Sequence, residues 1–234
     1  MRRFFYVAAG VAALAVAVPA AAQIVEVGQT TDTPPASCPG TNCRTVTRTT
    51  GFLTRAGALQ KPVLATQNGR VVALTLRLGA PDANQIKFFN QTYGGPARIA
   101  VTILTPRPKL NFKVVSQSEQ YALQQNFGQT IQIALHQSLR IRKGQVAAIT
   151  VPTWAPLLAV NLGGTNSWRA ARGTGKCNDF ATQTAQLTAG AQTQYRCLYT
   201  TARLTYSVTE VVDPTPRPPS LPPTTTTTPT TTTP

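Results

Sequence analysis

Acid–base catalysis by this chain would have to use very few carboxyl groups. The segment 44–212 contains only Asp82, Glu119, Asp179 and Glu210. A glycosidase needs two carboxyl groups about 5–10 Å apart. Asp82 follows Pro81 in a predicted turn and Glu210 ends the last predicted strand, so both are expected to be solvated. A polysaccharide hydrolase or lyase therefore depends on Glu119 and Asp179 meeting in one cleft.

Other catalytic and metal-binding patterns are missing from the sequence. His136 is the only histidine, and it interrupts the alternation of residues 131–135, which predicts a surface turn or bulge. There is no G-x-S-x-G, no H-E-x-x-H and no acidic calcium loop. The run 173–176 (GTGK) is similar to the end of a phosphate-binding loop, but Cys177 stands where serine or threonine is needed. We expect no cofactor and no metal, and the sequence favours a non-catalytic protein.

The charge balance points to binding of anions. The chain has 22 lysines and arginines against 7 acids, a net charge of +15. Charged residues make up only 12% of the sequence, about half the usual share, so the positive charge comes from missing acids. Arginines are expected to project outward from the predicted strands at Arg77, Arg98, Arg140, Arg142 and Arg203. Such a surface favours acidic wall polymers, uronic-acid polysaccharides or nucleic acid; alternatively, the arginines are scattered over an exposed sheet without a focused patch.

A second binding hypothesis concerns the loop 163–179. Trp168 lies there beside Arg169 and Arg172. An exposed tryptophan flanked by hydrogen-bonding side chains can stack on a sugar ring, and Trp154 could add a second platform. Alternatively, both indoles cover the ends of an apolar core. The apolar neighbours of Trp154 favour burial, whereas for Trp168 both positions stay open.

The hydrophobic pattern predicts an all-β fold. Apolar residues alternate with a period of two in four segments, which indicates strands with one buried face: 71–78, 98–104, 131–135 and 204–208. Only Asp82–Asn90 and Phe180–Leu187 are candidates for short helices. Strands with short connections predict an antiparallel two-sheet sandwich, similar to a jelly roll.

Four cysteines allow three disulfide pairings. Cys38 and Cys43 flank a Pro-Gly turn, and Cys177 and Cys197 would close the loop before the last strand, where a bridge contributes about 3 kcal/mol in the loop-entropy model. The spacing favours this local pairing over a bridge from an N-terminal cysteine to Cys197. A zinc site is disfavoured because the spacings do not match paired ligands.

Both ends of the chain differ in composition from the middle. Residues 1–22 read as a signal peptide, with Arg2 and Arg3 before an apolar run of about 15 residues, shorter than the ~20 of a membrane-spanning helix. Residues 23–43 form a polar lead-in and 44–212 the sandwich domain. Residues 213–234 contain eight prolines and ten threonines, which predicts a disordered tail. We expect a secreted, extracellular or envelope protein with no membrane span after cleavage.

One segment resembles a known structural element. Leu139–Val151 is similar to the strand–glycine turn–strand element of secreted bacterial β-sandwich domains with a jelly-roll-like fold, although many of these have aspartate where this chain has Gln145. The layout of signal, cysteine-flanked sandwich and Thr/Pro-rich tail is similar to secreted proteins of high-GC bacteria. The resemblance implies a fold and a location, but no reaction.

These observations predict a secreted or envelope-associated, non-catalytic binding module for an anionic glycan or other polyanion, such as a cell-wall polymer. The expected contacts are Trp168, Arg169, Arg172, Arg140 and Arg142. A structural or adhesive surface protein is the first alternative, and the hydrolase or lyase is the second. Nucleic acid stays open as a ligand.

Overall fold

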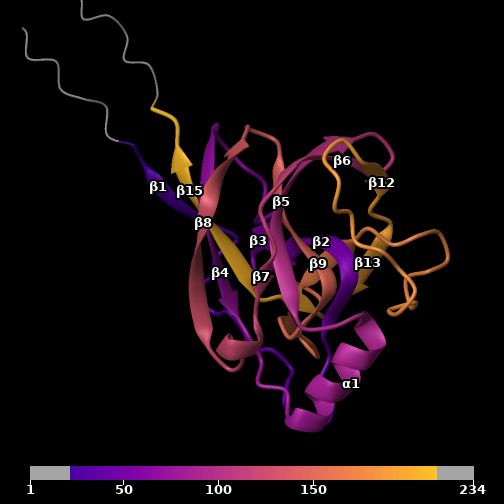
Figure 1. The fold of residues 1–234 in the computed structure, drawn as a ribbon. Helices are drawn as coiled ribbons and strands as arrows, with labels where there is room; N and C mark the ends of the chain where they lie inside the picture. Colours follow the sequence, from indigo (N-terminus) through magenta and orange to yellow (C-terminus); the bar gives the residue numbers. More distant parts are fainter. Residues whose placement is uncertain (1–21, 215–234) are drawn as a thin grey trace, which may run out of the picture. The chain divides into compact units, whose positions relative to one another are not determined.

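The computed structural model describes residues 22–214 and is built mainly of antiparallel β-strands, which confirms the predicted all-β sandwich (Figure 1). The predicted signal peptide, apart from Ala22, and nearly all of the predicted Thr/Pro-rich tail lie outside the described residues. Within 22–214, no helix is long and apolar enough to cross a bilayer.

The larger sheet contains nine strands. Seven of them follow in the order β12 (Gln192–Gln194), β6 (Asn111–Gln117), β5 (Arg98–Arg107), β9 (Val146–Ala155), β2 (Val46–Ala56), β11 (Ser167–Ala170) and β13 (Cys197–Thr200). The short strands β3 (Leu59–Gln60) and β7 (Tyr121–Ala122) pair with β2 and β5. Neighbours pair antiparallel throughout, which requires no helical crossovers.

The smaller sheet has the order β1 (Ile24–Val27), β15 (Tyr206–Val212), β4 (Gly69–Arg77) and β8 (Thr130–Ile141). A separate two-stranded ribbon pairs β10 (Leu158–Ala159) with β14 (Arg203–Leu204). In sequence, β10 follows β9 and β14 precedes β15. The predicted lead-in therefore supplies a strand, because β1 pairs with β15 over its whole length. His136 lies where the β4–β8 register shifts, at the predicted irregularity.

Apolar residues from both sheets form one core. Leu74 and Leu76 of β4 and Ile99 and Ile103 of β5 are fully buried. Tyr206 of the smaller sheet donates its hydroxyl to the carbonyl of Ala147 in the larger sheet at 2.9 Å, which ties the sheets together across the core. The predicted alternation thus identified residues that fill the space between the sheets.

One of the two predicted helices forms. Helix α1 (Ala83–Tyr93) begins at Asp82, whose carboxylate accepts from the Gln85 amide at 2.9 Å while the Gln85 side chain accepts from the Asp82 amide at 3.0 Å. This capping box satisfies amides that the first turn leaves unpaired, and Gly94 ends the helix with a positive φ. A 3-10 turn, η1 (Gln124–Asn126), is the other helical element.

The second prediction, a helix over Phe180–Leu187, is wrong. This segment is irregular because its polar groups bond to the larger sheet instead of to each other. Thr47 donates to the carbonyl of Phe180 at 3.0 Å, and Arg48 donates to that of Gln183 at 2.7 Å. Tertiary hydrogen bonds of this kind override a local helical tendency.

Two disulfides connect the predicted partners. Cys38 pairs with Cys43 and Cys177 with Cys197, separated by 5 and 20 residues. The favoured local pairing is therefore confirmed. Two intact bridges indicate an oxidising environment of the extracellular type.

A buried row of threonines crosses three neighbouring strands of the larger sheet. The Thr150 hydroxyl lies 2.8 Å from that of Thr50 and 2.6 Å from that of Thr102. Gln117 donates to Thr150 at 2.9 Å and to the carbonyl of Gln186 at 3.1 Å. The row therefore fastens the loop around Gln186 to this face of the sheet.

Thr150→Val should lower the melting temperature, because it removes the hydroxyl that shares buried hydrogen bonds with Thr50, Thr102 and Gln117. A loss of about 1–3 kcal/mol corresponds to roughly 2–12 °C for a domain of this size. Thermal unfolding followed by circular dichroism measures it. The exposed Thr130→Val in β8 is the control, and equal melting temperatures for the two variants would contradict a stabilising role of the threonine row.

Candidate functional site

The structure distributes the five predicted contact residues over three places. Arg140 and Arg142 line a groove that also takes in β5 and β6. Trp168 and Arg172 line a separate pocket. Arg169 lines an apolar depression next to Leu198 and Phe52, and its guanidinium donates to backbone carbonyls of residues 195 and 196. The predicted residues therefore do not form one continuous surface.

The basic groove is the cavity of about 730 Å³ lined by residues of β4, β5, β6 and β8 and the turn after β8. Five cations line it, and all five are exposed: Arg70, Arg107, Lys113, Arg140 and Arg142. No aspartate or glutamate is among its lining residues. Because β8 belongs to the smaller sheet and β6 to the larger one, the groove lies across the seam between the sheets.

Two of the five groove cations already have a partner in the fold. Arg70 donates to the Ser138 hydroxyl at 2.7 Å. Arg140 forms an ion pair with Asp213, with 2.8 Å between Nη2 and Oδ2. No ion pair forms within residues 22–214 at Arg70, Arg107, Lys113 or Arg142. Four uncompensated charges therefore remain available to an anion.

Sequence reasoning missed Arg70, Arg107 and Lys113. The outward position of Arg140 follows from its buried neighbours Leu139 and Ile141, and the same alternation would have identified Arg70 beside Val71. Arg107 and Lys113 belong to a β5–β6 hairpin that no pattern in the sequence connects with β8.

Two of the five arginines predicted to project outward do not. Arg203 is 3% exposed, and its guanidinium donates to the Thr30 hydroxyl of the segment after β1. Arg77 is half-buried and donates to the carbonyl of Thr33. The lead-in covers both side chains, so the prediction from alternation alone was wrong there. Arg98 is exposed but lies outside the basic groove.

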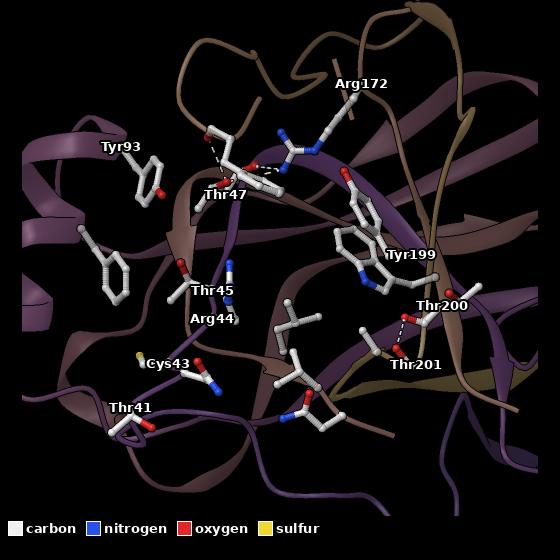
Figure 2. Close-up of a pocket in the computed structure, with 18 of the residues that line it drawn as sticks. Thr41, Cys43, Arg44, Thr45, Thr47, Tyr93, Arg172, Tyr199, Thr200 and Thr201 are labelled. Carbon is white, nitrogen blue, oxygen red and sulfur yellow. Dashed lines mark hydrogen bonds between the residues drawn. The ribbon is translucent and has the colours of Figure 1, made fainter. Parts of the chain in front are cut away.

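The aromatic pocket is the second cavity, of about 670 Å³. It is lined by residues of α1, β2, β11 and β13, the segment 41–45 and the loop around Phe180. Six aromatic side chains contribute: Phe88, Phe89, Tyr93, Trp168, Phe180 and Tyr199. Figure 2 shows Tyr93 on one side, Tyr199 on the other, and Arg172 near the upper edge. No carboxylate lines this pocket either.

Trp168 is a wall of this pocket and not an exposed platform. It is 3% exposed, and its ring stacks on Tyr199 with centroids 4.5 Å apart. A Cβ at position 51 would lie 3.0 Å from the indole, so Gly51 makes room for it. The indole Nε1–H has no acceptor within residues 22–214. Trp154 is fully buried, as predicted, and its indole donates to Asn90 at 2.9 Å.

Arg172 is a buried cation beside Trp168. It is 3% exposed and donates to the carbonyls of Asp179 and Thr47 at 2.8 and 2.9 Å. Its guanidinium carbon lies 5.0 Å from the Phe180 ring centroid, a cation–π contact. Burial lowers the pKa of Arg172, opposed by nearby Tyr199 and Asp179. An arginine stays charged at neutral pH, so the pocket wall carries a buried positive charge.

The two carboxylates on which a hydrolase would depend have different partners. Glu119 contacts His136 at the surface, with 2.7 Å between Oε1 and Nδ1. Asp179 accepts from Thr182, and hydrogen bonds from that residue are the main cause of its lowered pKa. Glu119 and Asp179 line neither of the cavities described above. Within residues 22–214, no group of three or more histidine, cysteine or acidic residues could hold a metal ion.

Glu210 was expected to be solvated, and this prediction was wrong. Its side chain is buried at 2% exposure because β1 and β4 flank β15 on both sides. A Cβ at Gly69 would lie 2.6 Å from its Oε1, so the glycine provides the space. Oε1 has no hydrogen-bond partner within residues 22–214. Burial raises the pKa of Glu210, and Asp213 adds to the effect.

Comparisons with known proteins leave this geometry as the only guide to function. No protein-family model, no curated protein and no solved structure matches the chain. The two acid-free cavities are therefore interpreted from their own residues.

Glu210→Gln should raise the melting temperature at a pH above the folded pKa of Glu210, where the buried carboxyl group is ionised without a hydrogen-bond partner at Oε1 within residues 22–214. A carboxyl group whose pKa is higher in the folded than in the unfolded state destabilises the fold above that folded pKa. The difference in melting temperature between the variant and the wild type should therefore shrink as the pH falls through the folded pKa of Glu210. Melting curves from pH 4 to 8 test this, with Glu26→Gln on β1 as an exposed control; a stabilisation that is independent of pH would contradict it.

Proposed function

We propose that this protein is a secreted or envelope-associated, non-catalytic binding module for an acidic polysaccharide, such as a cell-wall polymer, held in the basic groove. The observation that carries the proposal is the gathering of five exposed cations in one groove without a carboxylate among its lining residues. Two disulfides and a signal-like N-terminal sequence support an exported location.

Positive charge attracts any polyanion, and the groove concentrates positive charge in one place. A concave surface with one sign of charge focuses the electrostatic field and raises the local concentration of ligands of opposite charge. Four of the five cations are arginines, whose planar guanidinium groups match carboxylate and phosphate geometry. Because the groove is open and crosses four strands, it suits a chain better than a small compact ion.

The remaining lining residues favour a glycan over nucleic acid. Polar contacts are available from Thr105, Ser116, Ser138 and Gln145, which suit the hydroxyl groups of sugars. No aromatic side chain lines the groove, whereas single-stranded nucleic acid is generally held by stacking bases on aromatic rings. A polysaccharide that carries carboxylate or phosphate groups fits both the charges and the neutral groups.

The triple variant Arg107→Gln, Lys113→Gln, Arg142→Gln should bind polygalacturonate more weakly than the wild type. Each exposed ion pair contributes roughly 0.2–1 kcal/mol, so affinity should fall by about threefold to a hundredfold. Affinity chromatography and titration calorimetry measure the loss. Binding of the wild type should weaken as ionic strength rises, because salt screens exposed charges.

The matched control removes the same charge elsewhere. Arg55→Gln, Lys87→Gln, Arg98→Gln changes two arginines and one lysine, all exposed and outside the groove. It should lose much less affinity than the groove variant. An equal loss in both triples, or wild-type retention that does not change with salt, would contradict the groove as the binding site. Tighter binding of DNA than of the polyuronate would instead indicate a nucleic-acid ligand.

A further inference from the structure

The aromatic pocket contains a cation, Arg172, that has no ion-pair partner within residues 22–214. In this part of the chain Arg172 donates to neutral oxygens, namely the carbonyls of Asp179 and Thr47 and the Thr47 hydroxyl. The Asp179 carboxylate itself accepts from Thr182 and Gln183 and lies 3.6 Å from Lys176 Nζ. Arg172 is 3% exposed, and a buried charge is costly unless it is paired. The pocket therefore offers a compensating site to an anion.

Two buried N–H groups point to the same conclusion. Trp168 Nε1 and Arg172 Nε are buried without a hydrogen-bond partner within residues 22–214, and both side chains line the pocket. Such unsatisfied donors are rare in folded proteins, because each costs about 1–3 kcal/mol. Arg44 adds an exposed guanidinium to the lining. The unpaired N–H dipoles and the two guanidinium groups give this wall a positive potential that attracts an anion.

The rest of the lining describes the ligand further. Five hydroxyl groups come from threonines, namely Thr41, Thr45, Thr47, Thr200 and Thr201, and two amides come from Asn42 and Asn161. Six aromatic rings provide flat apolar surface. A volume of about 670 Å³ lies within the usual range for small-molecule sites. Flat apolar faces, many hydroxyl-compatible groups and positive charge together match a sugar ring that carries a carboxylate.

We propose that the aromatic pocket is a second binding site, distinct from the basic groove, for a short acidic saccharide such as a uronic acid mono- or disaccharide. The carboxylate binds the exposed guanidinium of Arg44 and is attracted by the buried charge of Arg172. The sugar ring packs against the aromatic walls, which include the Trp168 indole. The two sites share no lining residue. Binding in the pocket does not depend on binding in the groove, so an experiment can disprove either proposed site without the other.

The two tryptophans of this chain provide a direct test by NMR. They give two indole N–H resonances. The indole N–H of Trp154 already donates a hydrogen bond to Asn90. Addition of digalacturonate should shift the Trp168 resonance, assigned with Trp168→Phe, and leave that of Trp154 in place. Neutral galactose should bind at least about tenfold more weakly, since it lacks the charge that pairs with the guanidinium groups.

Variants separate the pocket from the groove and from folding defects. Arg44→Gln should weaken digalacturonate binding by about threefold to tenfold in calorimetry, and because Arg44 is exposed the melting temperature should not change. Trp168→Phe, which keeps a ring beside Tyr199, should weaken binding by a similar factor. The groove triple variant should keep the Trp168 shift in full.

Three results would overturn the proposal. The first is a Trp168 resonance that does not move at millimolar digalacturonate. The second is an equal shift with galactose, which would remove the role of charge. The third is loss of the shift in the groove triple variant, which would make the pocket signal a consequence of groove binding.

Discussion

The fold has to accommodate many cations with few carboxylates. Within residues 22–214, only two contacts pair a lysine or arginine with a carboxylate, Arg140–Asp213 and Lys176–Asp179. Arginines near the core therefore bond to neutral oxygens: Arg172 to backbone carbonyls and Arg203 to a threonine hydroxyl. Because acids are scarce, most cations at the surface stay uncompensated. The linings of both cavities, which contain no aspartate or glutamate, reflect this shortage.

Sheet packing decides where that charge gathers. The outward cations of β4 and β8 belong to one sheet, and those of β5 and β6 to the other. They share a groove because β8 and β6 lie close together where the sheets meet. Apolar contacts between the sheets fix this arrangement, and Tyr206 bridges it from β15 to β9. Electrostatic repulsion among the cations is thus opposed by burial of the core, and the resulting positive surface is the one for which a polyanion is proposed.

The aromatic pocket depends on loops that are fixed to the sheet. The Cys177–Cys197 bridge joins the long loop to β13, and Tyr199 of that strand stacks on Trp168. The threonine row around Thr150 fastens the same loop further along. Helix α1 closes another side, with Phe89 packed against Trp154 at 4.9 Å between centroids. These restraints hold the pocket walls in place, and such preorganisation would lower the entropic cost of the binding proposed for this pocket.

The sequence by itself determined the features that depend on neighbouring residues. Period-two alternation predicted the strands β4, β5, β8 and β15, cysteine spacing favoured both bridges, and Asp82–Asn90 was a candidate for the helix that forms as α1, because each reflects a local preference. Only the tertiary structure decided the burial of Trp168 and Glu210. It also decided the position of Arg203 and placed Arg107 and Arg142 in the same groove. Each of these depends on which distant segment packs over the side chain, and a strand pattern specifies a face without saying what will cover it.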